Sequence, residues 1–512
     1  MVLVDNGMVL DGTGAPGFRG GVLVEGDRIV DLLREGDARP ADCETVDANG
    51  AFVTPGFIDF HSHSDAYLVI EPDAPSKISQ GITTEVNGQC GGSAAPRYGE
   101  ARLSSDWAAV LGERLTWRSF SEYRAALEAA RPALNTVQFV GHNTLRSSVV
   151  GYAAREATPD ELNEMERLLA EALDEGWWGL TTGLIYQPGK YSTPAEVETL
   201  AAVAAKRGGF YATHMRSEGD AILEAIDEVI SLVRKTGIRA EISHLKTSGR
   251  RNWGKIDAVL DKMRGAVDRG LLLGSDRYPF CAAGTDLDVV LPDWAQEGAA
   301  KAVAERLADP ALRARIAAEL DDSGRDWSKV MIGGAWHEET RRLCGLTVEE
   351  ARGDESPGDF VCRVLALDGC KTGAFFFGMS EENMRRILAE PWIVPGSDAS
   401  LRAPWGPLGE DHPHPRAYST MPEFYRLTRD VARMTSVPAR RLGLSRRGVL
   451  AKGCYADIAV WDGDKFAGTA TYENPHRFAD GMKCVIVNGI ITYADGRFTG
   501  RRGGRFLERN GI

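Results

Sequence analysis

Short apolar runs alternate with helix-period segments through residues 56–435. The segments 159–176, 194–207 and 220–236 have the spacing of amphipathic helices. The apolar runs predict eight strands, with ends near His61, Cys90, His142, Tyr186, His214, Lys246, Tyr278 and Asp398. Strands that alternate with helices indicate a parallel sheet, and eight such units predict an α/β fold of the (β/α)₈ TIM-like barrel type.

Both ends of the chain carry short strand-like runs separated by glycine turns. Residues 1–55 and 436–512 each contain several of these runs, and the turns Asp462-Gly463 and Asn488-Gly489 follow two of them. The simplest arrangement is one small β-sandwich domain built from both ends, with the barrel between them. The stretch from about 283 to 372 is too long for one crossover, and its Ala/Glu/Arg-rich part, residues 295–320, predicts a helical subdomain inserted over the barrel mouth.

The strongest chemical signal is the apolar strand from Gly56 that runs into His61 and His63. Because side chains alternate along a strand, both imidazoles are expected on the same face, toward the barrel lumen. Two imidazoles at a strand end make half of a zinc site. An isolated pair with this spacing is as often two structural loop residues.

The other strand ends decide between these two interpretations. His214 and His244 each come late in a predicted strand, and Asp398 holds the equivalent position on the last strand. The carboxyl ends of the strands in such a barrel meet at one rim, where its active sites lie. Four histidines and a carboxylate at one rim predict a metal site.

With these residues in place, the pattern resembles the amidohydrolase superfamily. Within it, four motifs resemble the D-aminoacylases (N-acyl-D-amino-acid deacylases). They are Gly88-Gln89-Cys90-Gly91-Gly92-Ser93, Gly179-Leu180-Thr181-Thr182-Gly183-Leu184-Ile185-Tyr186, Ser243-His244-Leu245-Lys246 and His414-Pro415-Arg416. The resemblance spans nearly the whole chain and is weakest between about 283 and 372.

The resemblance implies a set of metal ligands. Cys90, His214 and His244 would hold one Zn²⁺ tightly. A second position, weakly occupied or empty, would lie among His61, His63 and Asp398. A thiolate binds zinc well, and zinc keeps it deprotonated at neutral pH. The alternative for Cys90 is an inert buried thiol, which its polar, glycine-rich surroundings disfavour.

The resemblance also implies how catalysis and substrate binding are divided. Asp398 would take a proton from the metal-activated water and return it to the departing amine. Lys246 and Tyr186 would bind the substrate carboxylate, with Arg416 as a further candidate. The alternatives are a helix cap for Asp398, a solvated lysine for Lys246 and a loop tyrosine for Tyr186.

The expected function is hydrolysis of N-acyl-D-amino acids. Hydantoinase-like and dihydroorotase-like relatives, which act on cyclic amides, use a carboxylated lysine at the end of strand four. That position offers Thr181, Thr182 and Tyr186, and Lys190 comes only after Pro188-Gly189. A D-dipeptidase or an N-carbamoyl hydrolase would use the same chemistry. A catalytically silent scaffold is the non-enzyme alternative, and the complete ligand set argues against it.

Composition restricts the partners. The 512 residues carry a net charge of −13 with no basic stripe, which disfavours nucleic acid and anionic membranes as partners. No signal peptide or apolar span is recognisable, so no membrane association is expected. The eight cysteines form no C-x-x-C pair, which suits a reducing cytoplasm. A small N-acyl amino acid is the expected partner.

Overall fold

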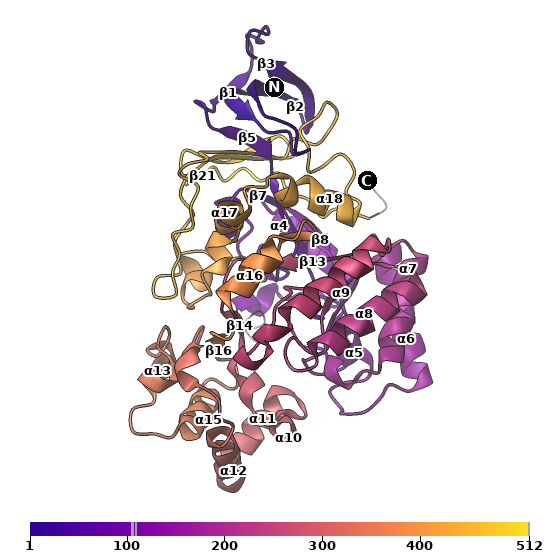
Figure 1. Cartoon of the computed structure of the whole chain (residues 1–512), viewed down its shortest axis with the longest axis vertical. Coiled ribbons are helices and arrows are strands. Elements are labelled where there is room, and N and C mark those ends of the chain that lie inside the picture. Colours follow the sequence, from indigo (N-terminus) through magenta and orange to yellow (C-terminus); the bar gives the residue numbers. More distant parts are fainter. Residues whose placement is uncertain (104–106, 108–109, 510–512) are drawn as a thin grey trace.

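The structure is a computed structural model that describes all residues except 104–106, 108–109 and 510–512. It has three parts along its long axis (Figure 1): a sheet at one end that contains the N-terminus, a barrel in the middle and a helical subdomain at the other end. No described helix combines the length and the apolar character needed to cross a bilayer.

The described part of the chain contains a closed parallel barrel. Its strands, in order around the barrel, are β6 (Phe57–Asp59), β7 (Ile82–Asn87), β8 (Asn135–Gln138) with β9 (Val140–Gly141), β10 (Gly179–Gly183), β11 (Phe210–His214), β12 (Arg239–Ile242), β13 (Leu273–Arg277) and β17 (Ile393–Pro395). Phe60 N donates to Pro395 O at 3.0 Å, which joins the first strand to the last, and Trp178 N donates to Gln138 O at 3.0 Å, which joins β8 to β10. The predicted barrel is therefore confirmed.

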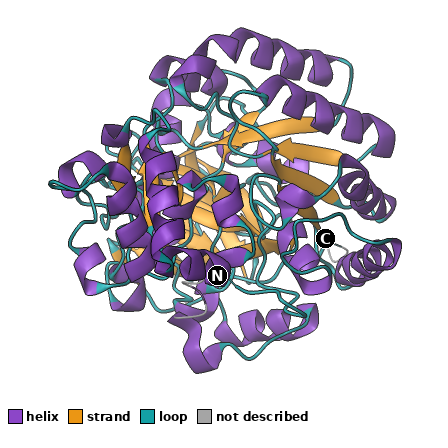
Figure 2. Cartoon of the chain, turned by 90° about the horizontal axis from the view of Figure 1, so that it is seen from below, coloured by secondary structure: helices purple, strands orange, loops and turns teal. Residues whose placement is uncertain are grey.

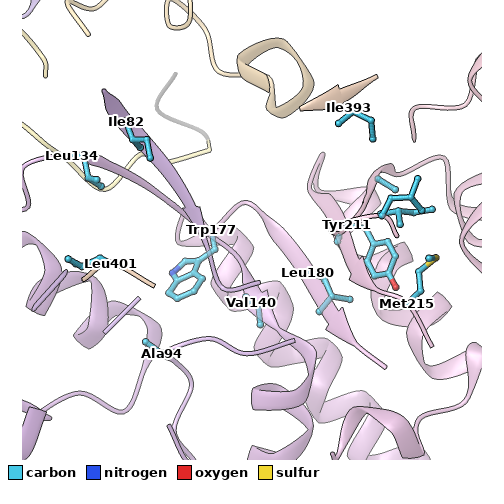
Figure 3. Close-up of a cluster of buried hydrophobic side chains, with 14 of the residues drawn as sticks. Ile82, Ala94, Leu134, Val140, Trp177, Leu180, Tyr211, Met215, Ile393 and Leu401 are labelled. Atoms are coloured by element: carbon cyan, nitrogen blue, oxygen red, sulfur yellow. The ribbon is translucent and has the colours of Figure 1, made fainter. Parts of the chain in front are cut away.

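Helices surround these strands (Figure 2), and apolar side chains pack between the two layers (Figure 3). Val140, Leu180 and Tyr211 of three strands belong to this core together with Leu168 and Leu200 of two helices. The surrounding helices are α4 (Phe120–Ala130), α5 (His142–Val149), α6 (Pro159–Asp174), α7 (Pro194–Lys206), α8 (Ile222–Thr236), α9 (Ile256–Asp268), α16 (Glu381–Leu388) and α17 (Arg416–Thr428).

Local sequence sets where the predicted helices begin. At α6 the Thr158 side chain accepts from Glu161 N, and the Glu161 carboxylate accepts from Thr158 N, so the first turn is capped from both sides. Proline occupies the first turn of both α6 and α7, where its missing N–H costs nothing. The three helices predicted from periodicity are all present, with ends that differ by one or two residues from the expected ones.

Strands from both ends of the chain form one nine-stranded sheet. The first group is β1 (Val2–Val9), β2 (Phe18–Glu25), β3 (Arg28–Arg34), β4 (Glu44–Asp47) and β5 (Phe52–Pro55), and the second is β18 (Ile458–Trp461), β19 (Met482–Val487), β20 (Ile490–Ala494) and β21 (Arg497–Phe498). The two groups meet where β5 pairs antiparallel with β18, with Val53 opposite Val460. Helix α18 (Ser436–Leu442) packs Ala439 and Leu442 against Phe210 at the amino-terminal end of the barrel.

The inserted subdomain has its own small sheet and core. Its strands are β14 (Ala283–Asp286), β15 (Val330–Ile332) and β16 (Gly373–Phe376), and its helices are α10 (Asp293–Gln296), α11 (Ala299–Ala308), α12 (Pro310–Asp321), α13 (Glu338–Arg341), α14 (Val348–Ala351) and α15 (Pro357–Leu367). The Ala/Glu/Arg-rich segment is not one continuous helix. Pro310 starts a new helix there, and the Asp309 carboxylate caps it by accepting from Ala311 N and Leu312 N.

Four strands end three or four residues before the predicted ends. β7 stops at Asn87, β10 at Gly183, β12 at Ile242 and β17 at Pro395. Cys90, Tyr186, Lys246 and Asp398 therefore lie on the loops that follow. Most residues of these loop segments are buried, which explains why their sequence resembles that of a strand.

A buried lysine fastens the first strand of the barrel to the last. Lys77 Nζ donates to Asp59 Oδ2 at 2.7 Å, to Ser397 Oγ at 2.9 Å and to Ala399 O at 2.8 Å. Asp59 Oδ1 in turn accepts from Ser397 N at 2.8 Å. None of the three side chains is exposed. The loops that carry His61 and Asp398 are therefore tied to one charged network at the point where the barrel closes.

Replacing Lys77 by Met is expected to lower the free energy of unfolding by about 3–5 kcal/mol, because it leaves the Asp59 carboxylate buried without its partner. The measurement is the midpoint of urea unfolding. Lys465→Met is the control, because the Lys465 side chain is 77% exposed beside Asp462 and its loss should change stability by no more than about 0.5 kcal/mol. Equal midpoints for the two variants would contradict a stabilising role for the Lys77 network.

Candidate active site

A cavity of about 680 Å³ opens at the carboxyl ends of the barrel strands. Its floor contains His63, Cys90, His214, His244 and Asp398. Its upper wall comes from the inserted subdomain through residues of β14 and β16, with Trp336 beside them. The predicted chemistry therefore lies where a barrel enzyme places it, and the subdomain covers it as expected.

Cys90 lies at the centre of the histidines. Its Sγ is 3.3 Å from His61 Nε2, 3.3 Å from His244 Nε2 and 3.7 Å from His214 Nδ1. The same Nε2 of His61 lies 3.3 Å from Asp398 Oδ1, which is also 3.1 Å from His63 Nε2. All six residues expected to bind metal are brought together.

The ligand atoms fall into two overlapping groups. One comprises His61, His63, Cys90 and Asp398, the other Cys90, His214 and His244, and within each group the ligand atoms lie within 4.8 Å of one another. Cys90 belongs to both, whereas the sequence analysis had placed it beside the tight position alone. A mixture of imidazole, thiolate and carboxylate ligands suits zinc, so the residues present fit the metal that the resemblance implies.

Three of these residues have unusual backbone conformations. Cys90, His244 and Asp398 have φ values of 51°, 38° and 50°, in the left-handed region that residues with a Cβ seldom occupy. Such conformations cost about 1–3 kcal/mol each and persist only where the surrounding structure imposes them. All three residues lie just past the end of a strand, and their side chains meet at the common centre.

The electrostatics of the centre favour a thiolate. Burial by itself would raise the pKa of Cys90, but His61 and His244 lower it by more, so the pKa lies well below its usual value of 9.0. Burial would likewise raise the pKa of Asp398, yet Arg416, with NH1 2.8 Å from Oδ2, holds it well below 3.8. Both groups are charged at neutral pH and offer lone pairs to a cation.

Two acidic residues stand behind the histidines, and the sequence analysis missed both. Asp276 Oδ2 lies 3.2 Å from His61 Nδ1, and Asp276 Oδ1 accepts from His244 N at 3.0 Å. Glu218 Oε1 lies 2.8 Å from His244 Nδ1. Asp276 could have been found from its place near the end of the seventh strand. Glu218 is on a loop, and only its spacing of four residues from His214 hinted at a connection.

The three expected substrate contacts all line the cavity. Lys246 Nζ is 2.5 Å from Glu218 Oε1. The Tyr186 hydroxyl accepts from Thr285 Oγ1 at 3.4 Å, and Arg416 NH2 donates to Gly284 O at 3.2 Å, so both contact the first strand of the subdomain. Two cations and a phenol thus surround the space above the ligand cluster.

The remaining histidine on a predicted strand end, His142, lies outside the cluster. Its Nε2 is 2.8 Å from Glu196 Oε1, which also accepts from Arg146 Nε at 3.0 Å. All three side chains are buried. His142 therefore belongs to an ion-pair network between α5 and α7.

A closed parallel barrel with imidazole, thiol and carboxylate groups at its rim is the architecture of a barrel hydrolase. The chain belongs to the amidohydrolase family, with residues 44–493 matching that family. It is 34% identical to an N-acyl-D-glutamate deacylase of Alcaligenes xylosoxydans xylosoxydans, over 99% of this chain and 96% of that one. It is also 34% identical to a D-aminoacylase of the same organism, over 99% and 97%.

Solved structures agree with this assignment. An N-acyl-D-glutamate deacylase from Bordetella bronchiseptica, crystallised with zinc and a phosphonate mimic of the tetrahedral intermediate, superposes with a TM-score of 0.83 and 32% identity, covering 99% of both chains. An L-hydantoinase from Arthrobacter aurescens superposes with a TM-score of 0.52 at 16% identity over 99% of both chains, which shows a shared fold alone.

Because Cys90 belongs to both ligand groups, Cys90→Ala is expected to abolish zinc binding at both, whereas His63→Ala should affect only one. The measurement is bound zinc per chain by elemental analysis after dialysis. Cys43→Ala is the control, since Cys43 is a free thiol remote from the cavity. Wild-type zinc content in Cys90→Ala would exclude Cys90 as a zinc ligand shared by the two groups.

Proposed function

We propose that the chain is a zinc-dependent deacylase of N-acyl-D-amino acids that releases a carboxylate and a free D-amino acid. The observation that carries the proposal is the convergence of Cys90 with four histidines and Asp398, all of which except the buried His61 line one cavity. Full-length relatives named as D-aminoacylase and N-acyl-D-glutamate deacylase support the substrate class and the D enantiomer.

The ligand set supports the metal. Cys90, His214 and His244 would hold the tighter zinc, and His61, His63 and Asp398, with Cys90 shared, would hold a second, weaker one. When bound, zinc supplies a Lewis acid for the amide carbonyl and lowers the pKa of a water molecule toward about 7.

Asp398 is proposed to transfer the proton during amide hydrolysis. Its carboxylate is deprotonated at neutral pH, is held by Arg416 and the two histidines, and faces the cavity. In that state it can accept the proton of the attacking water and then donate it to the nitrogen of the leaving amine. The tight hydrogen bonding of Ser397 and Ala399 to the Lys77 network keeps the loop of Asp398 in place.

Lys246, Arg416 and Tyr186 are proposed to bind the free carboxylate of the substrate. Lys246 and Arg416 both lie close to Tyr278, with their cationic groups 5.9 Å and 4.6 Å from its ring centroid. A carboxylate between two such cations would be fixed in direction, which orients the amide toward Asp398.

The structure disfavours the cyclic-amide alternative. The end of β10 carries Thr181 and Thr182, and Lys190 Nζ pairs with Asp293 Oδ1 at 3.1 Å, away from the ligand groups. No lysine of the described chain therefore stands where a carboxylated lysine would bridge two metals. We also propose a cytoplasmic location, since the eight free cysteines, among them a metal-binding thiolate, suit a reducing compartment.

Purified protein is expected to hydrolyse N-acetyl-D-amino acids and to leave the L enantiomers intact, with zinc bound in the same preparation. The measurement pairs amine release from matched D and L substrates with elemental analysis. Bound zinc without turnover of either enantiomer would contradict the proposed substrate class. Cyclic amides, D-dipeptides and N-carbamoyl amino acids would then be the candidate substrates. A metal-free, inactive protein would favour the silent scaffold.

Asp398→Asn is expected to lower kcat by at least about 100-fold, because it removes general acid–base catalysis. Zinc at Cys90, His214 and His244 should remain, since Asp398 lies outside that group. Steady-state kinetics and zinc content measure the two effects. Asp293→Asn is the control, because Asp293 is 92% exposed. Wild-type turnover in Asp398→Asn would exclude Asp398 as the proton carrier.

A further inference from the structure

Glu218 is an acidic residue of the cavity that the mechanism above does not use. It lies between β11 and α8, four residues after His214, and its side chain is 13% exposed. Its carboxylate reaches back to the floor of the cavity and contacts two histidines and a lysine there.

The contact with His244 determines which ring nitrogen can face a metal. His244 Nε2 points at Cys90 Sγ at 3.3 Å, and Nδ1 on the other side of the ring lies 2.8 Å from Glu218 Oε1. The Glu218 carboxylate thus faces the Nδ1 edge of the ring, and in this orientation Nε2 is the nitrogen that faces the ligand cluster.

His214 lies beside the same carboxylate. Its Nδ1 is 3.7 Å from Cys90 Sγ, and its Nε2 is 3.5 Å from Glu218 Oε2 without a hydrogen bond to it. The ring of His214 therefore packs against Glu218 with its Nδ1 edge toward Cys90.

Lys246 completes the set. Its Nζ lies 2.5 Å from Glu218 Oε1 and 2.7 Å from His244 Nδ1. Glu218 Oε1 accepts from Lys246 Nζ and also lies 2.8 Å from His244 Nδ1, so one carboxylate oxygen contacts both groups.

We propose that Glu218 is the positioning residue of the three-ligand metal group: it lies against His214, orients the imidazole of His244 for the metal and, with the same carboxylate, holds Lys246 at the edge of the substrate space. The second part rests on the proposed function, and the first does not. The imidazole of His61 faces Asp276 instead, and Asp276 reaches His244 only through its backbone N. The imidazoles of the two ligand groups thus contact different acids, and removing Glu218 should affect the three-ligand group more than the other.

The test replaces Glu218 by Gln, which keeps the shape and removes the charge and one acceptor oxygen. Loss of such outer contacts weakens metal binding by about 10- to 100-fold, and that is the expected rise in the zinc dissociation constant. Apo protein is titrated with zinc against a chromophoric chelator, so no substrate enters the measurement. The thermal midpoint of the apo protein should fall, because Lys246 loses its buried partner, so zinc affinity is measured at a temperature where the apo variant is folded. KM for N-acyl amino acids should rise as Lys246 loses its anchor.

Glu228→Gln is the matched control. Glu228 lies on α8 and pairs with Arg216 at 3.1 Å, away from the ligand groups, so its zinc affinity should be that of the wild type. Glu218→Asp keeps the charge with a shorter side chain and should recover part of the affinity lost in Glu218→Gln.

Wild-type zinc affinity in Glu218→Gln would overturn the proposal. An equal loss of zinc affinity in Glu228→Gln would overturn it too, because the effect would then not depend on the contacts of Glu218. Since zinc affinity is measured without substrate, either result leaves the proposed deacylase activity to be decided by turnover alone.

Discussion

All strands of a closed parallel barrel end on the same rim, and the candidate site depends on that constraint. Residues as distant in sequence as His61 and Asp398 become neighbours because the first and last strands close the barrel, joined by backbone hydrogen bonds and by the Lys77 network. The composition of the ligand cluster then depends on which side chains follow each strand. Without closure, the ligands that follow β6 and β7 would be separated from those of β11, β12 and β17, which belong to the other sheet.

Closure alone does not make the ligands converge. Cys90, His244 and Asp398 each adopt a left-handed backbone conformation, and Asp276 and Glu218 hold the imidazoles from behind. The barrel therefore stores local strain at its rim and offsets it with buried hydrogen bonds. A bound cation would add its own attraction for the Cys90 thiolate and the Asp398 carboxylate, so metal binding and the stability of the rim are coupled.

The sequence was most informative where a local period or a motif fixes the outcome. The eight strand units, the pair His61 and His63, and the three amphipathic helices follow from alternation and helix spacing. The sequence was least informative where tertiary packing decides. Buried segments past β7, β10, β12 and β17 looked like strand. Glu218 could not be placed because its loop conformation, not its spacing, brings it to His244.

The pairing of β5 with β18 connects parts of the chain separated by about 400 residues. A ribosome that adds about 5–20 residues per second needs roughly 20 to 80 s to make the intervening barrel and subdomain. During that interval β5 can pair with β1 on one side while its other edge has no partner, and an unpaired strand edge is a template for aggregation. Completion of this sheet is thus one of the last events of biosynthesis, and a chain truncated before residue 458 would retain its whole ligand set yet expose that edge permanently.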